Sequence, residues 1–369
     1  MSKTDPKHWG VSKDEWAKST TGCFALRVSR VIEETHDSRS IVLEVPSELA
    51  GSFAYQAGQF LSFKIPFEGM VLTRSYSLSS SPDVDHAHKV TIKRVDDGRV
   101  SNWMNDHVEE GDTLMVTPPG GLFVLTEADR KIVLFGGGSG ITPIISIVKT
   151  ALIKTRRQIK LVYANRDKRS VIFQKELDAL VSSHPDRLEV VHSLDDESGF
   201  LDLHRVKQIV HQDVHADFYL CGPGIFMSTV EEALRELRVD PSLLHVERFV
   251  SPLDPDRQEE APEAGPEAAA EPAAVADAPS KIVVVLDGTR HEIAYEPGEK
   301  LLAAARRAGL DPPFSCEEGY CSCCMAKLVA GDVKMDVNQC LTPELLEEGW
   351  VLTCQGRCAA GPVEVEYPD

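Results

Sequence analysis

The sequence predicts a multidomain protein: an antiparallel β-barrel, then an α/β domain with a parallel sheet, then a small C-terminal α+β module. Three observations carry this prediction. Apolar and polar residues alternate in short runs over residues 21–127, and buried strands then alternate with helices over residues 128–250. A segment rich in Pro, Ala and Glu, residues 251–280, separates these parts from residues 281–369.

The overall charge excludes some classes of partner. The formal net charge is -19, whereas wrapping nucleic acid or lying on an anionic membrane relies on clustered Lys and Arg. A basic protein partner fits this charge better. The first ten residues, MSKTDPKHWG, contain no apolar core of an export signal, and no apolar run reaches the roughly 18 residues that span a bilayer. We therefore expect a cytoplasmic protein.

The barrel is predicted from the runs FALRVSRVIEE, SIVLEVP, FLSFKIP and KVTIKRV, which turn residues separate. Residues 1–20 precede it as an extension, in which Trp9 and Trp16 are candidates for packing onto the barrel. The α/β domain follows, with the strand KIVLF leading into a glycine loop and a helix. The linker at 251–280 lacks any apolar period, so it cannot fold alone; as a flexible coil it would span roughly 30 Å.

Seven of the nine cysteines fall after residue 315. A C-terminal cluster of this kind indicates a metal site, whereas a secreted disulfide scaffold would spread its bridges through a small chain. The spacing C-x4-C-x2-C, followed by a cysteine after 29 more residues, is that of plant-type [2Fe-2S] proteins. A zinc ribbon is the alternative, and it would need Cys340 or Cys358 in its second pair. The predicted iron ligands are Cys316, Cys321, Cys324 and Cys354.

Cys323 is one thiol more than this spacing requires. We interpret it as a small side chain packed beside the loop; a redox role or a ligand exchange is the alternative. Gly319 and Ser322 are small, and would let backbone amides approach the cluster.

Two segments of the barrel carry groups that suit a flavin nucleotide. The run TRSYSLSSSP offers a cation in Arg74, a flat ring in Tyr76 and a hydroxyl in Ser77. The alternative is an ordinary edge strand that enters a serine-rich turn, which would have the same sequence pattern. The run VTIKRVDDGRVSNWM predicts a strand, a turn at residues 97–98, then Ser101 and Asn102 before a helix, whose first amides suit a phosphate.

Three motifs of the α/β domain carry possible nucleotide chemistry. GGGSGITP follows a buried strand but is not the G-x-G-x-x-G fingerprint, because Ile141 occupies the last glycine position. Cys221, in YLCGPG, ends a strand, where ligands of open α/β sheets bind; a small buried side chain is the alternative. Phe249, in HVERFVSP, would by itself be a core residue.

In this order, the motifs resemble those of the ferredoxin-NADP reductase superfamily, which has R-x-Y-S and G-x-x-S in a flavin barrel, a glycine loop ending in Thr-Pro, and C-G-P. The resemblance implies that Arg74 and Ser101 hold the FAD pyrophosphate, Tyr76 stacks on the flavin and Ser77 faces its N5 atom. It also implies that Cys221 positions the nicotinamide, that Phe249 covers the flavin, and that Glu247 lies near that site. The implied catalytic residues are Ser77, Cys221, Glu247 and Phe249. The implied cofactor-binding residues are Arg74, Tyr76, Ser77, Thr91, Ile92, Lys93, Gly98, Val100, Ser101, Gly136, Gly137, Gly138, Gly140, Thr142, Arg166, Cys221, Gly222, Pro223 and Phe249.

The nucleotide is left open between NADH and NADPH. The run YANRDKRS places Arg166, Lys168 and Arg169 where a 2′-phosphate would lie, but similar runs occur in relatives that use NADH, which we favour.

The whole domain order is similar to that of the reductase components of multicomponent oxygenases. The resemblance implies an NAD(P)H:acceptor oxidoreductase that passes electrons from NAD(P)H to FAD, to a β-grasp [2Fe-2S] ferredoxin domain and on to a terminal oxygenase. Several stretches, among them YQAGQF and GRVSNWM, are most similar to the branch that serves Rieske-type 3-ketosteroid 9α-hydroxylases in steroid degradation. A phenylacetyl-CoA epoxidase-type di-iron oxygenase is the alternative acceptor, and a non-catalytic redox sensor is the alternative class.

Overall fold

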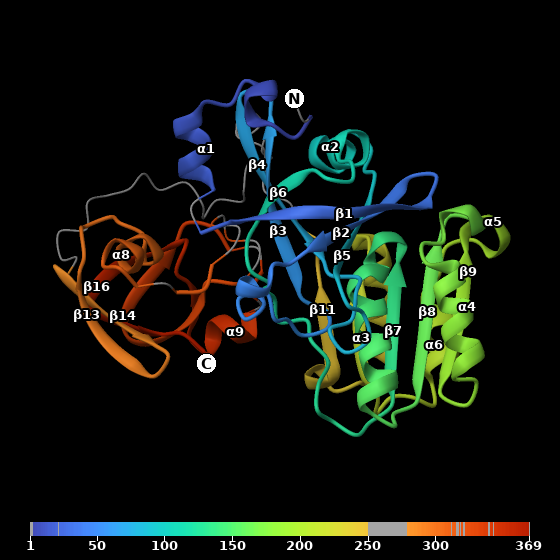
Figure 1. The fold of residues 1–369 in the computed structure, drawn as a ribbon. Helices are drawn as coiled ribbons and strands as arrows, with labels where there is room; N and C mark the ends of the chain where they lie inside the picture. Colours follow the sequence, from blue (N-terminus) through green and yellow to red (C-terminus); the bar gives the residue numbers. More distant parts are fainter. Residues whose placement is uncertain are drawn as a thin grey trace. The chain divides into compact units, whose positions relative to one another are not determined.

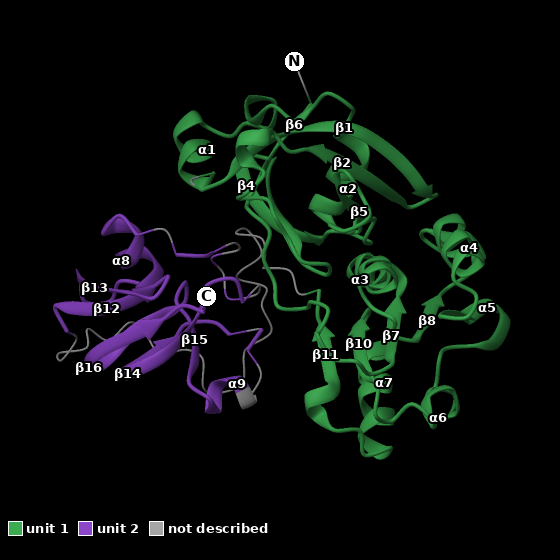
Figure 2. Cartoon of the chain, turned by 60° about the horizontal axis from the view of Figure 1, so that its bottom comes forward, with its two compact units in different colours: residues 1–249 green, residues 250–369 purple. Residues whose placement is uncertain are grey.

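The computed structural model describes residues 3–20, 22–249, 279–310, 312–314, 317, 319, 322–338, 340–341 and 343–368. The chain divides into two compact units, residues 1–249 and residues 250–369, which Figure 2 colours green and purple. The described strands form an antiparallel, a parallel and a mixed sheet, which confirms the predicted fold class (Figure 1). None of the described helices combines the length and apolar character that crossing a bilayer requires. Residues 251–278 of the predicted linker lie outside the described residues.

The first sheet closes into an antiparallel barrel. Its six strands follow the order β4-β3-β6-β1-β2-β5, and a bridge between Leu78 and Val90 joins the two edges. Inward side chains such as Leu26 and Phe63 are fully buried, because apolar residues alternate with polar ones along each strand. The barrel elements are β1 (Phe24–Thr35), β2 (Ser38–Glu44), η2 (Ser47–Leu49), β3 (Phe60–Phe67), β4 (Met70–Ser77), β5 (His88–Lys93), α2 (Arg99–His107) and β6 (Thr113–Val116).

The N-terminal extension packs onto this barrel through Trp9, as the sequence predicts. It contains η1 (Pro6–Trp9) and α1 (Lys13–Ser19). The Trp9 ring stacks on Phe67, with ring centroids 5.9 Å apart, and also contacts Trp103 of α2. The backbone N–H of Gly69 donates to the Trp9 carbonyl oxygen at 2.7 Å. These contacts tie the extension to the β3–β4 hairpin and to α2.

The second half of unit 1 is a parallel sheet with helices on both faces. Its strand order is β11-β10-β7-β8-β9, so the first strand, β7, lies between β10 and β8. Alternate side chains of β7 enter different hydrophobic cores: Leu134 packs with α3, and Phe135 packs with α6 and α7. Both faces of this strand are therefore buried, which explains its continuous apolar run. The place where the chain reverses the strand order, beside β7, is where open α/β sheets bind ligands.

The elements of this domain match the predicted alternation of strands and helices. They are β7 (Ile132–Gly137), η3 (Gly138–Gly140), α3 (Ile141–Lys154), β8 (Ile159–Asn165), η4 (Lys168–Ser170), α4 (Gln174–Ser183), β9 (Leu188–Leu194), α5 (Asp195–Ser198), α6 (Leu203–Val210), β10 (Asp217–Cys221), α7 (Gly224–Glu236), η5 (Pro241–Leu243) and β11 (Leu244–Glu247).

Unit 2 is a mixed sheet with one helix packed on its core. The strand order is β13-β12-β16-β14-β15; β12 and β16 run parallel, and the other neighbours run antiparallel. Leu301 and Ala305 of α8 are buried against this sheet, as expected for the β-grasp arrangement. The described elements are β12 (Lys281–Leu286), β13 (Thr289–Ala294), α8 (Leu301–Arg307), β14 (Met325–Met335), α9 (Pro343–Glu347), β15 (Trp350–Leu352) and β16 (Gly356–Glu366).

Candidate functional site

Three of the predicted nucleotide residues form one row at the carboxyl edge of the parallel sheet. Cys221, the last residue of β10, is paired in register with Gly136 of β7 on one side and with Glu247 of β11 on the other. These residues are far apart in the sequence, yet they lie at the same level of the sheet. The row lies beside the strand-order reversal, where a ligand of this fold is expected.

The glycine loop after β7 packs backbone against backbone on the Cys-Gly-Pro loop after β10. A Cβ atom at Gly140 would lie 2.1 Å from the Cys221 carbonyl oxygen, and one at Gly137 would lie 2.7 Å from the Pro223 ring. A Cβ atom at Gly222 would likewise lie 3.0 Å from the Gly137 backbone. This close packing requires glycine at all three positions.

The same loop leaves room for a phosphate. Gly138 has a positive φ of 52°, and a Cβ atom placed there would meet nothing within 4 Å. No described side chain caps the N-terminus of α3, which begins directly after the loop. The N-terminus of a helix favours an anion, so the loop fits a dinucleotide phosphate. The Thr142 hydroxyl donates to the Ser139 carbonyl oxygen at 3.0 Å, which stabilises the turn itself.

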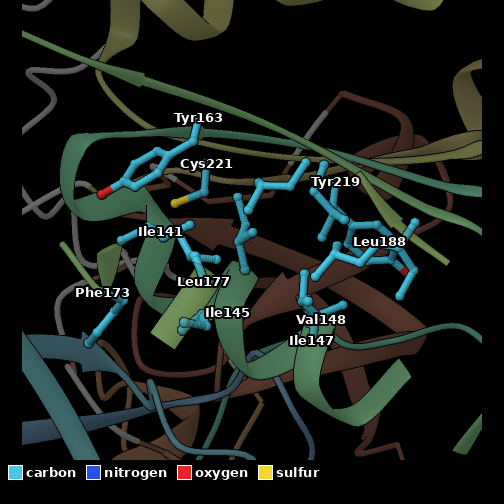
Figure 3. Close-up of a cluster of buried hydrophobic side chains, with 14 of the residues drawn as sticks. Ile141, Ile145, Ile147, Val148, Tyr163, Phe173, Leu177, Leu188, Tyr219 and Cys221 are labelled. Atoms are coloured by element: carbon cyan, nitrogen blue, oxygen red, sulfur yellow. The ribbon is translucent and has the colours of Figure 1, made fainter. Parts of the chain in front are cut away.

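Cys221 is fully buried, and its thiol lies in the apolar core near Ile141 and Tyr163 (Figure 3). Burial raises the pKa of the Cys221 thiol well above its ordinary value, and the Glu247 carboxylate raises it further. A neutral thiol is a poor nucleophile, so the side chain can position a ligand but is not activated for covalent chemistry. Burial also raises the pKa of the half-buried Glu247, from 4.5 to about 7. This carboxyl group therefore changes its charge near neutral pH.

Phe249 and Arg166, two of the predicted nucleotide residues, are exposed. Phe249, two residues beyond the end of β11, is 47% exposed, so it is available to cover a ligand and is not the core residue that its sequence alone would suggest. Arg166 follows β8, and its Nη2 atom donates to Asp37 Oδ2 at 3.0 Å. Asp37 comes from the β1–β2 turn of the barrel and also lies 3.6 Å from the Lys93 ammonium. One carboxylate thus joins two predicted cofactor-binding residues.

The predicted flavin residues of β4 lie on a regular strand. Arg74 pairs with Phe63 and Tyr76 with Leu61 of β3, so Arg74 and Tyr76 share a face of the strand. Both side chains are half-buried, and Ser77 is buried at the end of the strand. The Arg74 guanidinium also lowers the pKa of the Tyr76 hydroxyl somewhat, against the larger effect of burial, which raises it.

In the second flavin segment, the helix begins earlier than the sequence suggests. Ser101 is the third residue of α2, and Gly98 is its N-cap. No described side chain caps this helix, and a Cβ atom at Gly98 would lie 2.5 Å from Ser101 Oγ. Glycine therefore keeps the helix N-terminus accessible, as a bound pyrophosphate requires. Val100 is buried in the barrel core and fixes this end of the helix.

Two neighbouring predicted flavin residues, Thr91 and Ile92, have buried side chains. Thr91 is buried, and its Oγ1 atom lies 2.7 Å from both Ser40 Oγ and Ser79 Oγ. Ile92 is buried in the barrel core. These two residues can offer only their main chain to a cofactor, whereas the half-buried Lys93 can offer its ammonium group.

In unit 2, two of the four predicted iron ligands are described, and they lie together. The backbone N–H of Cys354 donates to Cys324 Sγ at 3.5 Å, and both thiols are buried. Cys316 and Cys321 lie outside the described residues. Among the described side chains, no three potential ligands gather into a metal site. Cys323 is only half-buried, so the buried pair favours Cys324 as the ligand, as the spacing does.

The loop around these cysteines is shaped for a negatively charged group. Glu317, Gly319 and Ser322 all have positive φ angles, and a Cβ atom at Gly319 would lie 2.7 Å from the Val337 carbonyl oxygen. Backbone of this kind forms concavities lined by N–H groups. The Cys324 thiol lowers the pKa of Cys354, and the N–H groups of Gly319 and Gln355 lower it further. This donor set fits a thiolate-bound iron–sulfur cluster.

Two residues of these sites had no signal in the sequence. Asp37 lies 129 residues from Arg166 in the chain and stands in an ordinary turn. Gln355 follows a predicted ligand, but only the structure shows its amide directed at sulfur. Cys340 is another near neighbour, whose thiol donates to the Gly319 carbonyl oxygen at 3.5 Å.

Three family models match consecutive parts of the chain. The oxidoreductase FAD-binding domain matches residues 25–125, and the oxidoreductase NAD-binding domain matches residues 134–232. The 2Fe-2S iron–sulfur cluster binding domain matches residues 284–359. The chain therefore combines FAD-binding, NAD-binding and [2Fe-2S]-binding domains.

Curated relatives and solved structures resemble almost the whole chain. The ferredoxin reductase component of 3-ketosteroid-9-alpha-monooxygenase from Rhodococcus rhodochrous is 42% identical over 93% of this chain and 96% of its own length. One component of the 1,2-phenylacetyl-CoA epoxidase from Escherichia coli K12 is 30% identical over 94% of this chain and 98% of its own length. The structure of phthalate dioxygenase reductase has the same fold, with a TM-score of 0.57, 22% identity, and coverage of 95% of this chain and 99% of that one.

Proposed function

This chain belongs to the family of FAD- and [2Fe-2S]-binding oxygenase reductases, and on that premise we propose that it supplies electrons from NADH to a 3-ketosteroid 9α-hydroxylase of the Rieske type. The observation that carries the proposal is the 42% identity to a steroid monooxygenase reductase over 93% of the chain, with all three cofactor domains included. A shared single domain would support only the oxidoreductase class, which is already established. Identity along the whole chain supports the same type of acceptor.

The barrel residues have distinct tasks in this proposal. When bound, FAD accepts two electrons as hydride from the nicotinamide, and the [2Fe-2S] cluster carries one electron at a time. Arg74 and the uncapped start of α2, at Gly98, Val100 and Ser101, bind the FAD pyrophosphate. Tyr76 packs against the flavin ring, and Ser77 faces its reactive nitrogen. Thr91, Ile92 and Lys93 line the adenine side, the first two through their main chain.

The nucleotide domain binds and orients the electron donor. The loop glycines and the N-terminus of α3 bind the phosphates of the nucleotide, and Arg166 lies at the ribose. Cys221, Gly222 and Pro223 form a neutral surface against which the nicotinamide packs. Glu247 stands beside Cys221 at the carboxyl edge of the sheet, and the exposed Phe249 would cover the flavin when it is bound. In this proposal, the catalytic residues Ser77, Cys221 and Phe249 position the flavin and the nicotinamide, and Glu247 supplies a carboxyl group beside them. Gly136, Gly137, Gly138, Gly140 and Thr142 shape the loop.

The C-terminal unit delivers electrons to the oxygenase. Cys316, Cys321, Cys324 and Cys354 hold the cluster, a set that the burial of the described pair supports. Residues 281–369 contain 15 acidic and 8 basic residues, a net charge of -7, which suits a basic docking surface on the acceptor. We place the protein in the cytoplasm, because its electron donor fits a reducing compartment and its described cysteines form no disulfide.

A reconstitution assay tests the acceptor. The purified, cofactor-loaded chain is mixed with NADH and either a 3-ketosteroid 9α-hydroxylase or a phenylacetyl-CoA epoxidase oxygenase, and product is measured per NADH consumed. We expect tight coupling with the steroid enzyme and poor coupling with the epoxidase. The reverse pattern would favour the epoxidase alternative, which the 30% identical relative supports. NADH oxidation that is coupled to neither acceptor would reject both.

A further inference from the structure

Gln355 is a buried polar residue directly beside a predicted iron ligand. It follows Cys354 and is only 3% exposed. Its Nε2 atom donates to the Glu317 carbonyl oxygen at 2.8 Å and lies 3.7 Å from Cys354 Sγ. Its Oε1 atom accepts from the Lys300 ammonium at 3.3 Å. A buried amide with this many partners is fixed in position.

These partners also determine which way round the amide lies. The Lys300 ammonium can only donate a hydrogen bond, so it must face the amide oxygen. The Glu317 carbonyl can only accept, so it must face the amide nitrogen. If the amide were flipped, it would lose both bonds. The amide nitrogen is therefore on the side of the Cys354 sulfur, 3.7 Å away, where its second N–H group can donate.

An N–H donor at a ligand sulfur has a definite consequence for a redox centre. Reduction adds one negative charge to an iron–sulfur cluster, and part of this charge resides on the sulfur atoms. A hydrogen bond to sulfur stabilises the reduced form more than the oxidised form, and so raises the reduction potential. The positive charge of Lys300, held on the far side of the same amide, polarises the N–H group and acts in the same direction.

We propose that Gln355, oriented by Lys300, is a positioning residue that raises the reduction potential of the [2Fe-2S] cluster through its hydrogen bond to Cys354. The inference rests on the proposed assignment of Cys354 as an iron ligand. It assigns to the Lys300–Gln355 pair a task that neither the cysteine spacing nor the family models supply. The pair keeps the cluster able to take electrons from the flavin.

The experiment is an anaerobic redox titration of the full-length, cofactor-loaded chain, in which the signal of the reduced cluster is followed by electron paramagnetic resonance. Gln355→Leu removes the whole amide. Gln355→Glu keeps the shape but replaces the N–H donor with a carboxylate, which adds a negative charge beside the sulfur. Lys300→Met removes the positive charge together with its hydrogen bond to Gln355 Oε1. Tyr367→Phe is the matched control. The Tyr367 hydroxyl donates to Thr353 Oγ1, which in turn donates to the Cys324 carbonyl oxygen, so this variant loosens the backbone of a ligand without touching sulfur.

We expect both Gln355 variants to lower the equilibrium constant for one-electron reduction about tenfold, a shift of about 59 mV to more negative potential. Lys300→Met should shift the potential less, in the same direction, and Tyr367→Phe should leave it unchanged. An unchanged potential in Gln355→Glu and Lys300→Met, with iron content intact, would overturn the inference. If Gln355→Leu fails to assemble a cluster, the potentials of Gln355→Glu and Lys300→Met still test the inference. Cys354→Ser separates the two claims: an unaltered visible spectrum would reject the ligand assignment itself.

Discussion

Cys221 and Glu247 are paired in register on the neighbouring parallel strands β10 and β11, at the carboxyl edge of the sheet. The pairing places a neutral thiol beside a carboxyl group whose pKa burial raises to about 7. Gly136 completes the row on the other side of Cys221. The reacting end of the nucleotide is thus expected to meet one group that stays neutral near pH 7 and one that titrates there.

Glu247 should make the binding of the product NAD⁺ depend on pH. The oxidised nicotinamide ring carries a positive charge, so an ionised carboxylate beside it strengthens binding. Because the pKa of Glu247 is about 7, the affinity for NAD⁺ should rise as the pH increases through this value. Glu247→Gln should remove the rise. Calorimetric titration with NAD⁺ between pH 6 and pH 8, roughly one pH unit on either side of the Glu247 pKa, measures this rise in affinity. Glu232→Gln, which changes an exposed carboxylate, is the control. A rise that persists in Glu247→Gln would contradict this role.

The same group should affect stability in the opposite direction. Its pKa is higher in the folded chain than the ordinary 4.5, so the folded state binds more protons between pH 4.5 and about 7. The stabilisation is complete below the ordinary value, and is lost as the pH rises through about 7. Glu247→Gln should therefore reduce the fall in the free energy of unfolding across this range, which denaturant titrations at several pH values can measure. An equal fall in both proteins would show that the folded-state pKa is not raised.

Asp37 should favour NADH over NADPH. Its carboxylate pairs with Arg166, the predicted partner of a 2′-phosphate, and the backbone of Asp196 in the acidic α5 donates to the Arg166 carbonyl oxygen. The phosphate would have to displace Asp37, and would then meet its negative charge. Asp37→Ser should improve KM for NADPH several-fold, with a smaller change for NADH. Asp106→Ser, which breaks the Arg94 ion pair of the same barrel, is the matched control. No change in the NADPH/NADH ratio would contradict the role of Asp37.

The adjacent thiols of Cys323 and Cys324 should behave differently. Cys324 is buried beside Cys354, whereas Cys323 is half-buried. Cys323→Ser should keep the visible spectrum of the cluster, and Cys324→Ser should alter or lose it. Absorption spectra and iron content of the two purified variants give the answer. The opposite pattern would move the ligand assignment by one residue.

Electron transfer from the cluster to the oxygenase should become slower as the salt concentration rises. The net charge of -7 on residues 281–369 attracts a basic partner, and the screening length falls from about 10 Å at 0.1 M salt to about 3 Å at 1 M. The rate of cluster reoxidation by the oxygenase, measured at several ionic strengths, should therefore decline. Electron transfer from flavin to cluster within the chain is the internal control. A rate of reoxidation that does not depend on salt would reject electrostatic docking.

The fold and the cofactor classes could be predicted from the sequence because they follow from local patterns. Three local patterns predict them: the alternation of apolar and polar residues in the barrel, the fully apolar strand before a glycine loop, and the spacing of the cysteines. The sequence predicts a helix that begins after Asn102, but α2 already begins at Arg99. Its N-cap, Gly98, has no capping side chain, so the sequence carries no signal for this start. The resemblance places Thr91 at the cofactor, but its buried hydroxyl is already hydrogen-bonded to Ser40 and Ser79.

Long-range polar contacts could not be predicted in this way. The contact of Asp37 with Arg166 depends on how the barrel packs against the parallel sheet, and no periodicity in the sequence encodes it. The orientation of Gln355 depends on Lys300, which lies at the start of α8, 55 residues before Gln355 in the sequence. Such contacts need the folded backbone, because each joins elements that are not neighbours along the chain.

The central claim is that electrons pass from NADH through FAD to the [2Fe-2S] cluster and on to an oxygenase. Anaerobic stopped-flow mixing of the cofactor-loaded chain with NADH, followed at the flavin and cluster absorption bands, tests it most directly. We expect the flavin band to bleach first and the cluster band next, and the cluster band to recover when the steroid oxygenase is added. A flavin that bleaches while the cluster stays oxidised, or a chain with both cofactors that NADH does not bleach, would contradict the account.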